Sequence, residues 1–424
     1  MQEKVQDIKE GIRLHYIKTD KFKTNLMTLF LTIPLKRETV TSYALIPAVL
    51  RRGTKRLPTQ EAISKELENM YGATFNCGID KMGDQQVIKF YLETVNDQYL
   101  MQKEQLLKAS IQQLLEIVLN PYQKDQGFDP DYVEGEKKNL KQIIEAKIDN
   151  KNLYAMNRCI EEMFQGYAYS LYKYGYTEDL SNIDAQKLYQ DYQRLLQTAK
   201  IDIFLSGDFS YEEAKSCVCE NSYIQGLQPR SMQDVLKKDN QRKKHEEIQY
   251  VQDTMDVTQG KLVIGMDVEN AGEEKDCFST IVYNTILGDS ANSKLFQNVR
   301  EKAHLAYTTR SNYSQLKQTI FIRAGIEIAN YQKAYDIIQE QLEDMKQGKF
   351  TEDELKNAKN TIMSSIDAME EEQDSEIIYY FGQELSQRFT TPAEYKERVQ
   401  AIQREDVIRV ANQMKINTVY FLKK

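Results

Sequence analysis

Two side chains that could donate hydrogen bonds to a ligand lie seven residues apart within the segment from Asn284 to Tyr313. Arg300 stands at the end of an apolar-striped stretch that predicts a short helix, and Tyr307 stands in the strand-like stretch that follows. A guanidinium can donate hydrogen bonds to peptide carbonyl groups, and a phenol can donate one to a developing oxyanion. The alternative is structural, because a helix dipole favours a cation near its C-terminus and Tyr307 could be a half-buried strand residue.

Histidine is too scarce for a local zinc site. The 424 residues include three histidines, His15, His245 and His304, which lie far apart in the sequence. None belongs to a His-x-x-x-His or His-x-x-Glu-His pattern, the arrangement by which one helix presents two zinc ligands. Cys217 and Cys219 have no second pair and no nearby histidine, so they do not predict a zinc site either.

The composition is that of a globular protein, and we expect it to be cytoplasmic. The cysteines are odd in number and scattered, which fits a reducing compartment. No apolar run approaches about 18 residues and the first residues lack an apolar core, so we expect neither a membrane span nor a secretory signal. The net charge of −8 argues against a general nucleic-acid binder. The basic stretch at 236–245 favours a solvated linker over a nucleic-acid patch.

The order of the predicted elements occurs twice, with a repeat of about 200 residues. Each half reads as two strands, two short helices, two strands, several longer helices and a closing strand. The pattern predicts an α+β protein with two domains of the same type, each a largely antiparallel sheet with helices packed on one face. The expected boundaries are a first domain at 1–222, a linker at 223–246 and a second domain at 247–424.

Two motifs in these halves resemble signatures of the M16 peptidase family, which includes pitrilysin and the mitochondrial processing peptidase. LGDSANSKLFQNVREKAHLAY, residues 287–307, is similar to the family's second-half signature, a glycine-rich turn followed by S-x-L-F-x-x-x-R-E-K-x-x-L-A-Y. RRGTKRLPTQEAISKELENMYGATFNC, residues 51–77, resembles the segment that follows the family's zinc motif. The resemblance spans nearly the whole chain. Within the family the chain looks most like the YmfF-type bacterial members, which lack the zinc motif.

The resemblance implies that the zinc site is degenerate. In active members two histidines one helical turn apart bind zinc, a glutamate between them is the general base, and a glutamate from a later helix completes the site. Aligned on Gly53 and Thr54, the first histidine falls on Ala44, the base on Pro47 and the second histidine on Ala48. Aligned on Glu136 and Lys137, the later glutamate falls on Ile143. The resemblance thus implies no metal in this chain and no activity of the chain alone.

The resemblance gives Arg300 and Tyr307 a role that depends on a partner. In active members the second domain supplies such an arginine and tyrosine, which hold the substrate backbone near the scissile bond. In heterodimeric members one subunit brings the zinc and the other brings this pair. We therefore expect a zinc-bearing paralogue of similar size (YmfH-type) as partner and a small unfolded or precursor peptide as substrate. The alternatives are an inert peptide-binding or structural scaffold, and a homodimer of the isolated chain.

Overall fold

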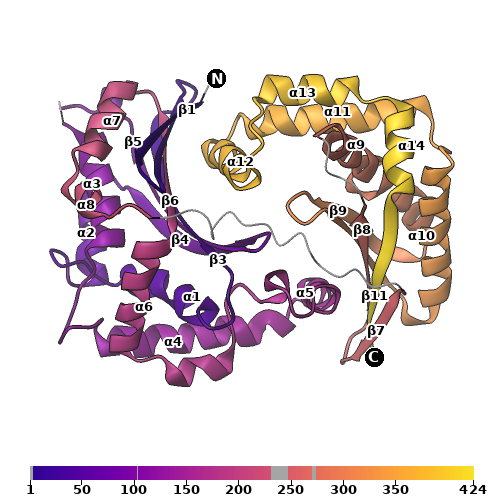
Figure 1. Cartoon of the computed structure of the whole chain (residues 1–424), viewed down its shortest axis with the longest axis horizontal. Coiled ribbons are helices and arrows are strands. Elements are labelled where there is room, and N and C mark those ends of the chain that lie inside the picture. Colours follow the sequence, from indigo (N-terminus) through magenta and orange to yellow (C-terminus); the bar gives the residue numbers. More distant parts are fainter. Residues whose placement is uncertain (1–2, 103, 231–246, 270–273) are drawn as a thin grey trace. The chain divides into compact units, whose positions relative to one another are not determined.

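The computed structural model describes residues 3–102, 104–230, 247–269 and 274–424. They form two compact units, each built around one β-sheet (Figure 1). Unit 1 comprises Met1–Ala146, Leu171–Asp239 and Glu371–Phe389. Unit 2 comprises Lys147–Ser170, Asn240–Glu370 and Thr390–Lys424. Each unit therefore includes a helical segment that comes from the other half of the sequence.

The sheet of unit 1 has six strands in the order β1-β2-β6-β3-β5-β4. β2 and β6 run parallel, and the other neighbouring strands are antiparallel. The strands are β1 (Glu3–Lys9), β2 (Ile12–Lys18), β3 (Thr24–Pro34), β4 (Thr74–Met82), β5 (Gln85–Val95) and β6 (Lys200–Gly207). The helices are α1 (Val40–Leu50), α2 (Gln60–Asn69), α3 (Leu106–Leu119), α4 (Pro130–Glu145), α6 (Ala185–Thr198), α7 (Tyr211–Cys219), α8 (Ser222–Gly226) and α12 (Gln373–Ser386).

Both faces of the central strand β3 are covered, which explains its nearly unbroken apolar sequence. Leu29 and Leu31 point into the main core, together with residues of α1 and α3. Phe30 points to the opposite face, where its ring stacks on Phe381 of α12. The predicted layer of helices on one face of the sheet is thus supplemented by one helix on the other face.

The sheet of unit 2 has five strands in the order β7-β11-β8-β10-β9, with β7 and β11 parallel and the other neighbours antiparallel. The strands are β7 (Gln249–Thr254), β8 (Gly260–Val268), β9 (Ala306–Ser314), β10 (Thr319–Ile326) and β11 (Met414–Lys423). The helices are α5 (Lys151–Met163), α9 (Glu274–Asn284), α10 (Tyr331–Lys346), α11 (Glu352–Met369), α13 (Pro392–Ala401) and α14 (Arg404–Asn412). Two π-helical segments, η5 (Thr285–Asp289) and η6 (Phe296–Lys302), follow α9.

Helix α5 covers the second face of this sheet, as α12 does in unit 1. Its residues Ala155, Cys159 and Met163 form a small core with Val263 and Phe321. The strand order β2-β6-β3-β5-β4 in unit 1 matches β7-β11-β8-β10-β9 in unit 2. The predicted α+β fold with two domains of the same type is therefore confirmed, and unit 1 differs by the additional strand β1.

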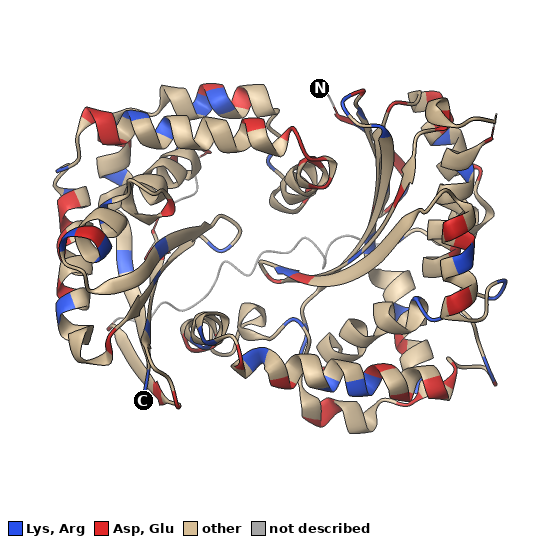
Figure 2. Cartoon of the chain, turned by 180° about the vertical axis from the view of Figure 1, so that it is seen from behind, with Lys and Arg blue, Asp and Glu red and all other residues tan. Residues whose placement is uncertain are grey.

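The predicted linker at 223–246 lies partly within the described residues. Ile224, on α8, is buried in the main core of unit 1, and Arg230 is also buried. Residues 231–246, with His245 and most of the basic stretch, lie outside the described residues. The domain boundaries at 222 and 247 remain a prediction. In the described part of the chain, no helix has the length and apolar character needed to cross a bilayer. The outer helices carry charges of both signs (Figure 2).

Candidate functional site

The residues at the inferred zinc positions lie on α1 and α4, which pack against each other. Ala44 and Pro47 are buried, and Ala48 is half-buried. Pro47 lies inside α1, where its ring nitrogen has no hydrogen to donate to the preceding turn. Ile143, on α4, is 46% exposed. Methyl groups, a proline ring and an aliphatic side chain offer no metal ligand, so these residues do not fit a zinc ion.

Helix α4 holds no acidic side chain in a position to replace Ile143. Glu136 is buried and forms an ion pair with Arg52, next to the C-terminal end of α1. Asn139 also donates to Glu136, over 2.9 Å. Glu145 is exposed at the end of α4, where it lies 3.7 Å from Lys141. The carboxylate of Glu136 therefore attaches α4 to the residue Arg52 after α1, and the carboxylate of Glu145 lies in solvent.

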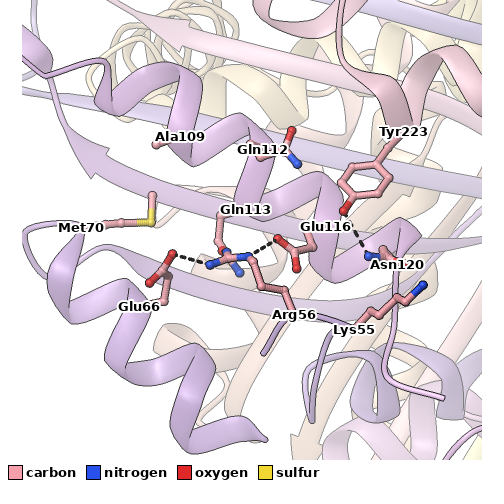
Figure 3. A pocket seen from close by; sticks show the side chains of 10 residues that line it. All are labelled: Lys55, Arg56, Glu66, Met70, Ala109, Gln112, Gln113, Glu116, Asn120 and Tyr223. Atoms are coloured by element: carbon pink, nitrogen blue, oxygen red, sulfur yellow. Dashed lines mark hydrogen bonds and ion pairs between the residues drawn. The ribbon is translucent and has the colours of Figure 1, made fainter. Parts of the chain in front are cut away.

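The loop after α1 is anchored to α3 by a polar network that lines a pocket of about 420 Å³ (Figure 3). The hydroxyl of Thr54 donates to the buried carboxylate of Glu116 over 2.8 Å. Arg56 donates to Glu116 over 3.0 Å, to Glu66 over 2.9 Å and to the amide oxygen of Gln113 over 2.6 Å. Two carboxylates thus neutralise the arginine, and the network serves to hold the C-terminal end of α1.

Strand β4 lies at the edge of its sheet, beside α1. It pairs with β5 on one side only. The thiol of Cys77 lies 3.6 Å from the carbonyl oxygen of Pro47, so the edge strand passes next to the inferred zinc positions. Burial raises the pKa of Cys77 to about 11, which makes it a poor nucleophile at neutral pH. The unpaired edge has free backbone groups that an extended peptide can join.

One group of potential metal ligands occurs within the described residues, in the interior of unit 1. It consists of His15, Asp202 and Glu384, all buried. The ammonium of Lys200 lies 2.7 Å from Asp202 and 3.0 Å from Glu384, so a cation already occupies the position between the two carboxylates. His15 bonds to Asp202 over 3.0 Å and to Glu3 over 2.7 Å. We interpret this group as an ion network that attaches α12 to β2 and β6.

Arg300 lies on the π-helical segment η6, close to its C-terminal end. Its side chain is 43% exposed, and its Nε lies 3.5 Å from Glu301. The guanidinium lies over the ring of Phe296, 4.6 Å from the ring centre. Short π-helical turns are frequent at functional sites because they alter which side chains face outward. Arg300 is therefore oriented by its own helix and remains accessible to a ligand.

Tyr307 is the extra residue of a β-bulge on edge strand β9. Ala306 is opposite Ile326 and Thr308 is opposite Gly325, which leaves Tyr307 without an opposite residue on β10. Its side chain is 57% exposed, and among the described residues its hydroxyl has no hydrogen-bond partner. Bulges redirect side chains and are frequent beside active sites. The alternative of a half-buried strand residue is wrong, because the bulge places Tyr307 on the surface.

The η5 and η6 segments are held against β9 by close backbone contacts. A Cβ atom at Gly288 would lie 2.6 Å from the hydroxyl of Ser311 and 2.8 Å from its backbone nitrogen. The amide of Leu305 donates to the carbonyl of Val299 over 3.0 Å and closes the turn between η6 and β9. This turn brings Arg300 and Tyr307 onto neighbouring elements. Gly288 thus permits a close approach of η5 and β9. The motif contains this glycine, but it does not indicate which element lies against it.

Three further cationic side chains lie around one cavity together with Thr308, the residue that follows Tyr307. Lys261, Arg310 and Arg323 lie on three neighbouring strands and line one cavity. They are far apart in the sequence, and only the strand register brings them together. No local pattern could have grouped them.

Comparison with known proteins agrees with the resemblance seen in the motifs. Residues 182–362 match the model of the peptidase M16 inactive domain. The chain is 33% identical to "Probable inactive metalloprotease YmfF" of Bacillus subtilis (strain 168) over 97% of this chain and 96% of that protein. The crystal structure of a conserved protein from Enterococcus faecalis V583 superimposes with a TM-score of 0.90 at 25% identity, covering 100% of this chain and 99% of that one. A peptidase M16 inactive domain from Pseudomonas fluorescens superimposes with a TM-score of 0.80 at 16% identity, covering 100% and 98%.

Proposed function

Because the chain belongs to the M16 peptidase family, we propose that it is the non-catalytic subunit of a heterodimeric zinc peptidase of this family. Its partner is a zinc-bearing paralogue of similar size (YmfH-type). The pair works in the cytoplasm and cleaves small unfolded or precursor peptides. This chain contributes Arg300 and Tyr307 to the site, and the partner contributes zinc and the general base.

One contrast within the chain carries the proposal. The four positions of the metal site hold hydrocarbon side chains, whereas the arginine and tyrosine of the second-half motif are present and exposed. A chain that used neither the metal site nor the arginine and tyrosine would have no reason to keep these two side chains accessible. The 33% identity to a "Probable inactive metalloprotease" over almost the whole length supports the inactive half of the proposal.

The chemistry of the two residues suits a substrate clamp. The guanidinium of Arg300 donates to carbonyl groups of the bound peptide and fixes its position. The hydroxyl of Tyr307 donates to the oxygen on which negative charge develops when the partner's base activates water. Both side chains can act as hydrogen-bond donors.

The proposal is tested by peptide cleavage with this chain alone, with the zinc-bearing paralogue alone and with both chains. We expect activity only in the mixture, and we expect Arg300→Ala and Tyr307→Ala to abolish most of it. Arg194→Ala is a matched control, because Arg194 is an exposed arginine on a helix of unit 1. A mixture that is no more active than the paralogue alone would refute the heterodimer.

The second candidate function, an inert scaffold that binds peptides, is favoured by the free edge of β4. It predicts peptide binding by this chain with no gain in cleavage on mixing. Size-exclusion chromatography of the mixture separates the two functions, since the scaffold requires no stable complex with the paralogue. The same measurement on the isolated chain shows whether it forms a homodimer.

A further inference from the structure

Three cationic side chains without an acidic partner line a small cavity in unit 2. Lys261 on β8, Arg323 on β10 and Arg310 on β9 surround a volume of about 180 Å³ on the face of the sheet that α5 covers. Other residues at its wall are Asn152, Thr308 and Gly325. The volume is below the several hundred Å³ of cavities that enclose whole drug-sized ligands. It suits a single charged group rather than an entire peptide.

The two arginines lie directly opposite each other in the sheet. Arg310 and Arg323 are paired in the register of β9 and β10. Like charges at directly opposite positions destabilise a sheet. Arg323 donates to Asn312 over 2.6 Å, but its buried Nε has no hydrogen-bond partner. Among the described residues Arg310 has no hydrogen bond or ion pair through its side chain. Arg310 is exposed to solvent, so the unsatisfied group is the buried Nε of Arg323. An anion between the two guanidinium groups would give this Nε an acceptor and would offset the like-charge repulsion.

Gly325 makes room for the ligand beside Lys261. A Cβ atom at position 325 would lie 3.1 Å from the hydroxyl of Thr308 and 3.5 Å from the ammonium of Lys261. That ammonium donates to Gln259 over 3.3 Å, and no carboxylate in the described part of the chain lies within 4.0 Å of it. Burial lowers the pKa of Lys261, and burial together with the charge of Arg310 lowers the pKa of Arg323. Burial is the largest cause for both groups, and at Arg323 the opposing charge of Asp289 offsets it only in part.

The nearest compensation comes from Asp289, and it is incomplete. Both arginines lower the pKa of Asp289, although burial raises it by more. Asp289 forms no ion pair within 4.0 Å with either arginine in the described structure. One carboxylate at a distance leaves the three cations with an excess of positive charge. The cavity is therefore selective for an anionic group.

We propose that this cavity binds a carboxylate of the peptide that the chain holds, either an acidic side chain or the C-terminal carboxylate. The inference rests on the proposed function, because a peptide is the ligand assumed there. Thr308, at the wall of the cavity, directly follows Tyr307 in the sequence. A peptide bound at Tyr307 therefore has only a short distance to the cavity. Charge-assisted hydrogen bonds from guanidinium groups then fix one end or one acidic residue of the peptide.

The test uses the isolated full chain and calorimetric titration with unlabelled peptides, so that no cleavage is needed. Four N-acetylated, eight-residue peptides of alanine and serine carry one central Glu or Gln and end in a free or amidated carboxyl group. The peptide with a central Gln and an amidated end carries no carboxylate. We expect it to bind at least about tenfold more weakly than the tightest-binding of the other three peptides, which is the loss typical of one charge-assisted hydrogen bond. Dependence on the central Glu identifies the side chain as the ligand, and dependence on the free end identifies the C-terminus.

Arg310→Gln should weaken binding of the preferred peptide about tenfold or more, and Lys261→Gln should weaken it as well. Lys356→Gln is the control of equal charge, because Lys356 is exposed on α11. Arg310→Gln should also leave the thermal midpoint unchanged or raise it, since it removes a like-charge pair. A purely structural role predicts a lower midpoint. Equal binding of all four peptides, no binding at millimolar concentration, or no effect of Arg310→Gln would overturn the proposal.

Failure of this test and failure of the proposed function can be told apart. A chain that binds acidic peptides here but gives no cleavage with the paralogue keeps the carboxylate site and loses the heterodimer. Cleavage by the mixture that is insensitive to Arg310→Gln and to the Glu-to-Gln exchange keeps the heterodimer and overturns the carboxylate site.

Discussion

The ring of Phe381 stacks on the ring of Phe30 with the centroids 3.8 Å apart and the planes inclined by 7°. The two residues are distant in sequence, since Phe30 belongs to β3 and Phe381 to α12, which comes from the second half of the chain. Both are almost completely buried. The stack therefore covers one face of the sheet of unit 1 with a helix from the other half, and the folding of unit 1 depends on both halves.

Phe381→Ala should destabilise unit 1 by roughly 3–5 kcal/mol, the usual cost of removing a large buried aromatic side chain. Phe389→Ala is the control, because Phe389 is 57% exposed and substitutions at exposed sites cost at most about 0.5 kcal/mol. The measurement is urea unfolding followed by far-UV circular dichroism. Equal midpoints for the two variants would show that α12 contributes little to the stability of unit 1.

Gly288→Ala should be destabilising by more than about 1 kcal/mol, because its Cβ would lie 2.8 Å from the backbone nitrogen of Ser311. Strand β9 and segment η5 would have to move apart. Gly135→Ala is the matched control, since Gly135 lies inside helix α4 and a Cβ there meets no atom within 4 Å. That variant should be neutral or stabilised by about 0.5–1 kcal/mol, as alanine favours helix. A thermal midpoint of Gly288→Ala as high as that of Gly135→Ala would contradict the close approach.

Much of the fold could be predicted because the signals are local. The apolar runs of β3 and β6 and the periodic stripe of α11 identify these elements, and the repeat of their order gives the architecture. The sequence does not indicate strand β1, because its residues EKVQDIK are polar and half-exposed at a sheet edge. The start of helix α3 at Leu106 is also not indicated, because Asn96 caps a short 3-10 turn after which Leu100 is extended.

The candidate site also has one part that local sequence indicates and another part that it does not. Arg300 and Tyr307 were found from a motif that is continuous in sequence, and the hydrocarbon residues at the zinc positions could be read directly. The bulge at Tyr307 and the opposition of Arg310 and Arg323 follow from the register of β9 against β10. The exchange of α5 and α12 between the units follows from tertiary packing. Neither register nor packing leaves a periodic signal in a single sequence.

Tyr307→Phe should lower kcat of the heterodimer by about 10²–10³ with a smaller effect on KM, because an oxyanion donor acts mainly in the transition state. Arg300→Ala should raise KM as well, since a guanidinium that holds the substrate backbone also binds the ground state. Tyr99→Phe is the control, because Tyr99 is 50% exposed on unit 1. The measurement is steady-state cleavage with excess mutant subunit. A wild-type kcat for the paralogue mixed with the Tyr307→Phe variant would show that the hydroxyl takes no part in catalysis.

His15 should make the stability of the chain depend on pH above neutrality. Burial alone would lower the pKa of His15, but its hydrogen bonds to Asp202 and Glu3 outweigh burial and raise the pKa to about 9. Since this value exceeds that of the unfolded chain, about 6.5, the stabilisation is complete below pH 6.5 and is lost as the pH rises through about 9. A change of one in a pKa corresponds to about 1.4 kcal/mol, so the loss is on the order of 3 kcal/mol.

The groups that face His15 support this direction. Asp202, whose pKa is lowered despite its burial, accepts from His15 and from Lys200, and the ring of Phe204 stacks on the imidazole at 4.0 Å. We expect the urea unfolding free energy to fall between pH 6.5 and 9 more steeply in the wild type than in His15→Gln. His304→Gln, at an exposed histidine, should keep the wild-type slope. If His15→Gln does not fold, NMR titration of the imidazole in the wild type decides, because a midpoint near 6.5 would show that the network does not hold a charged histidine.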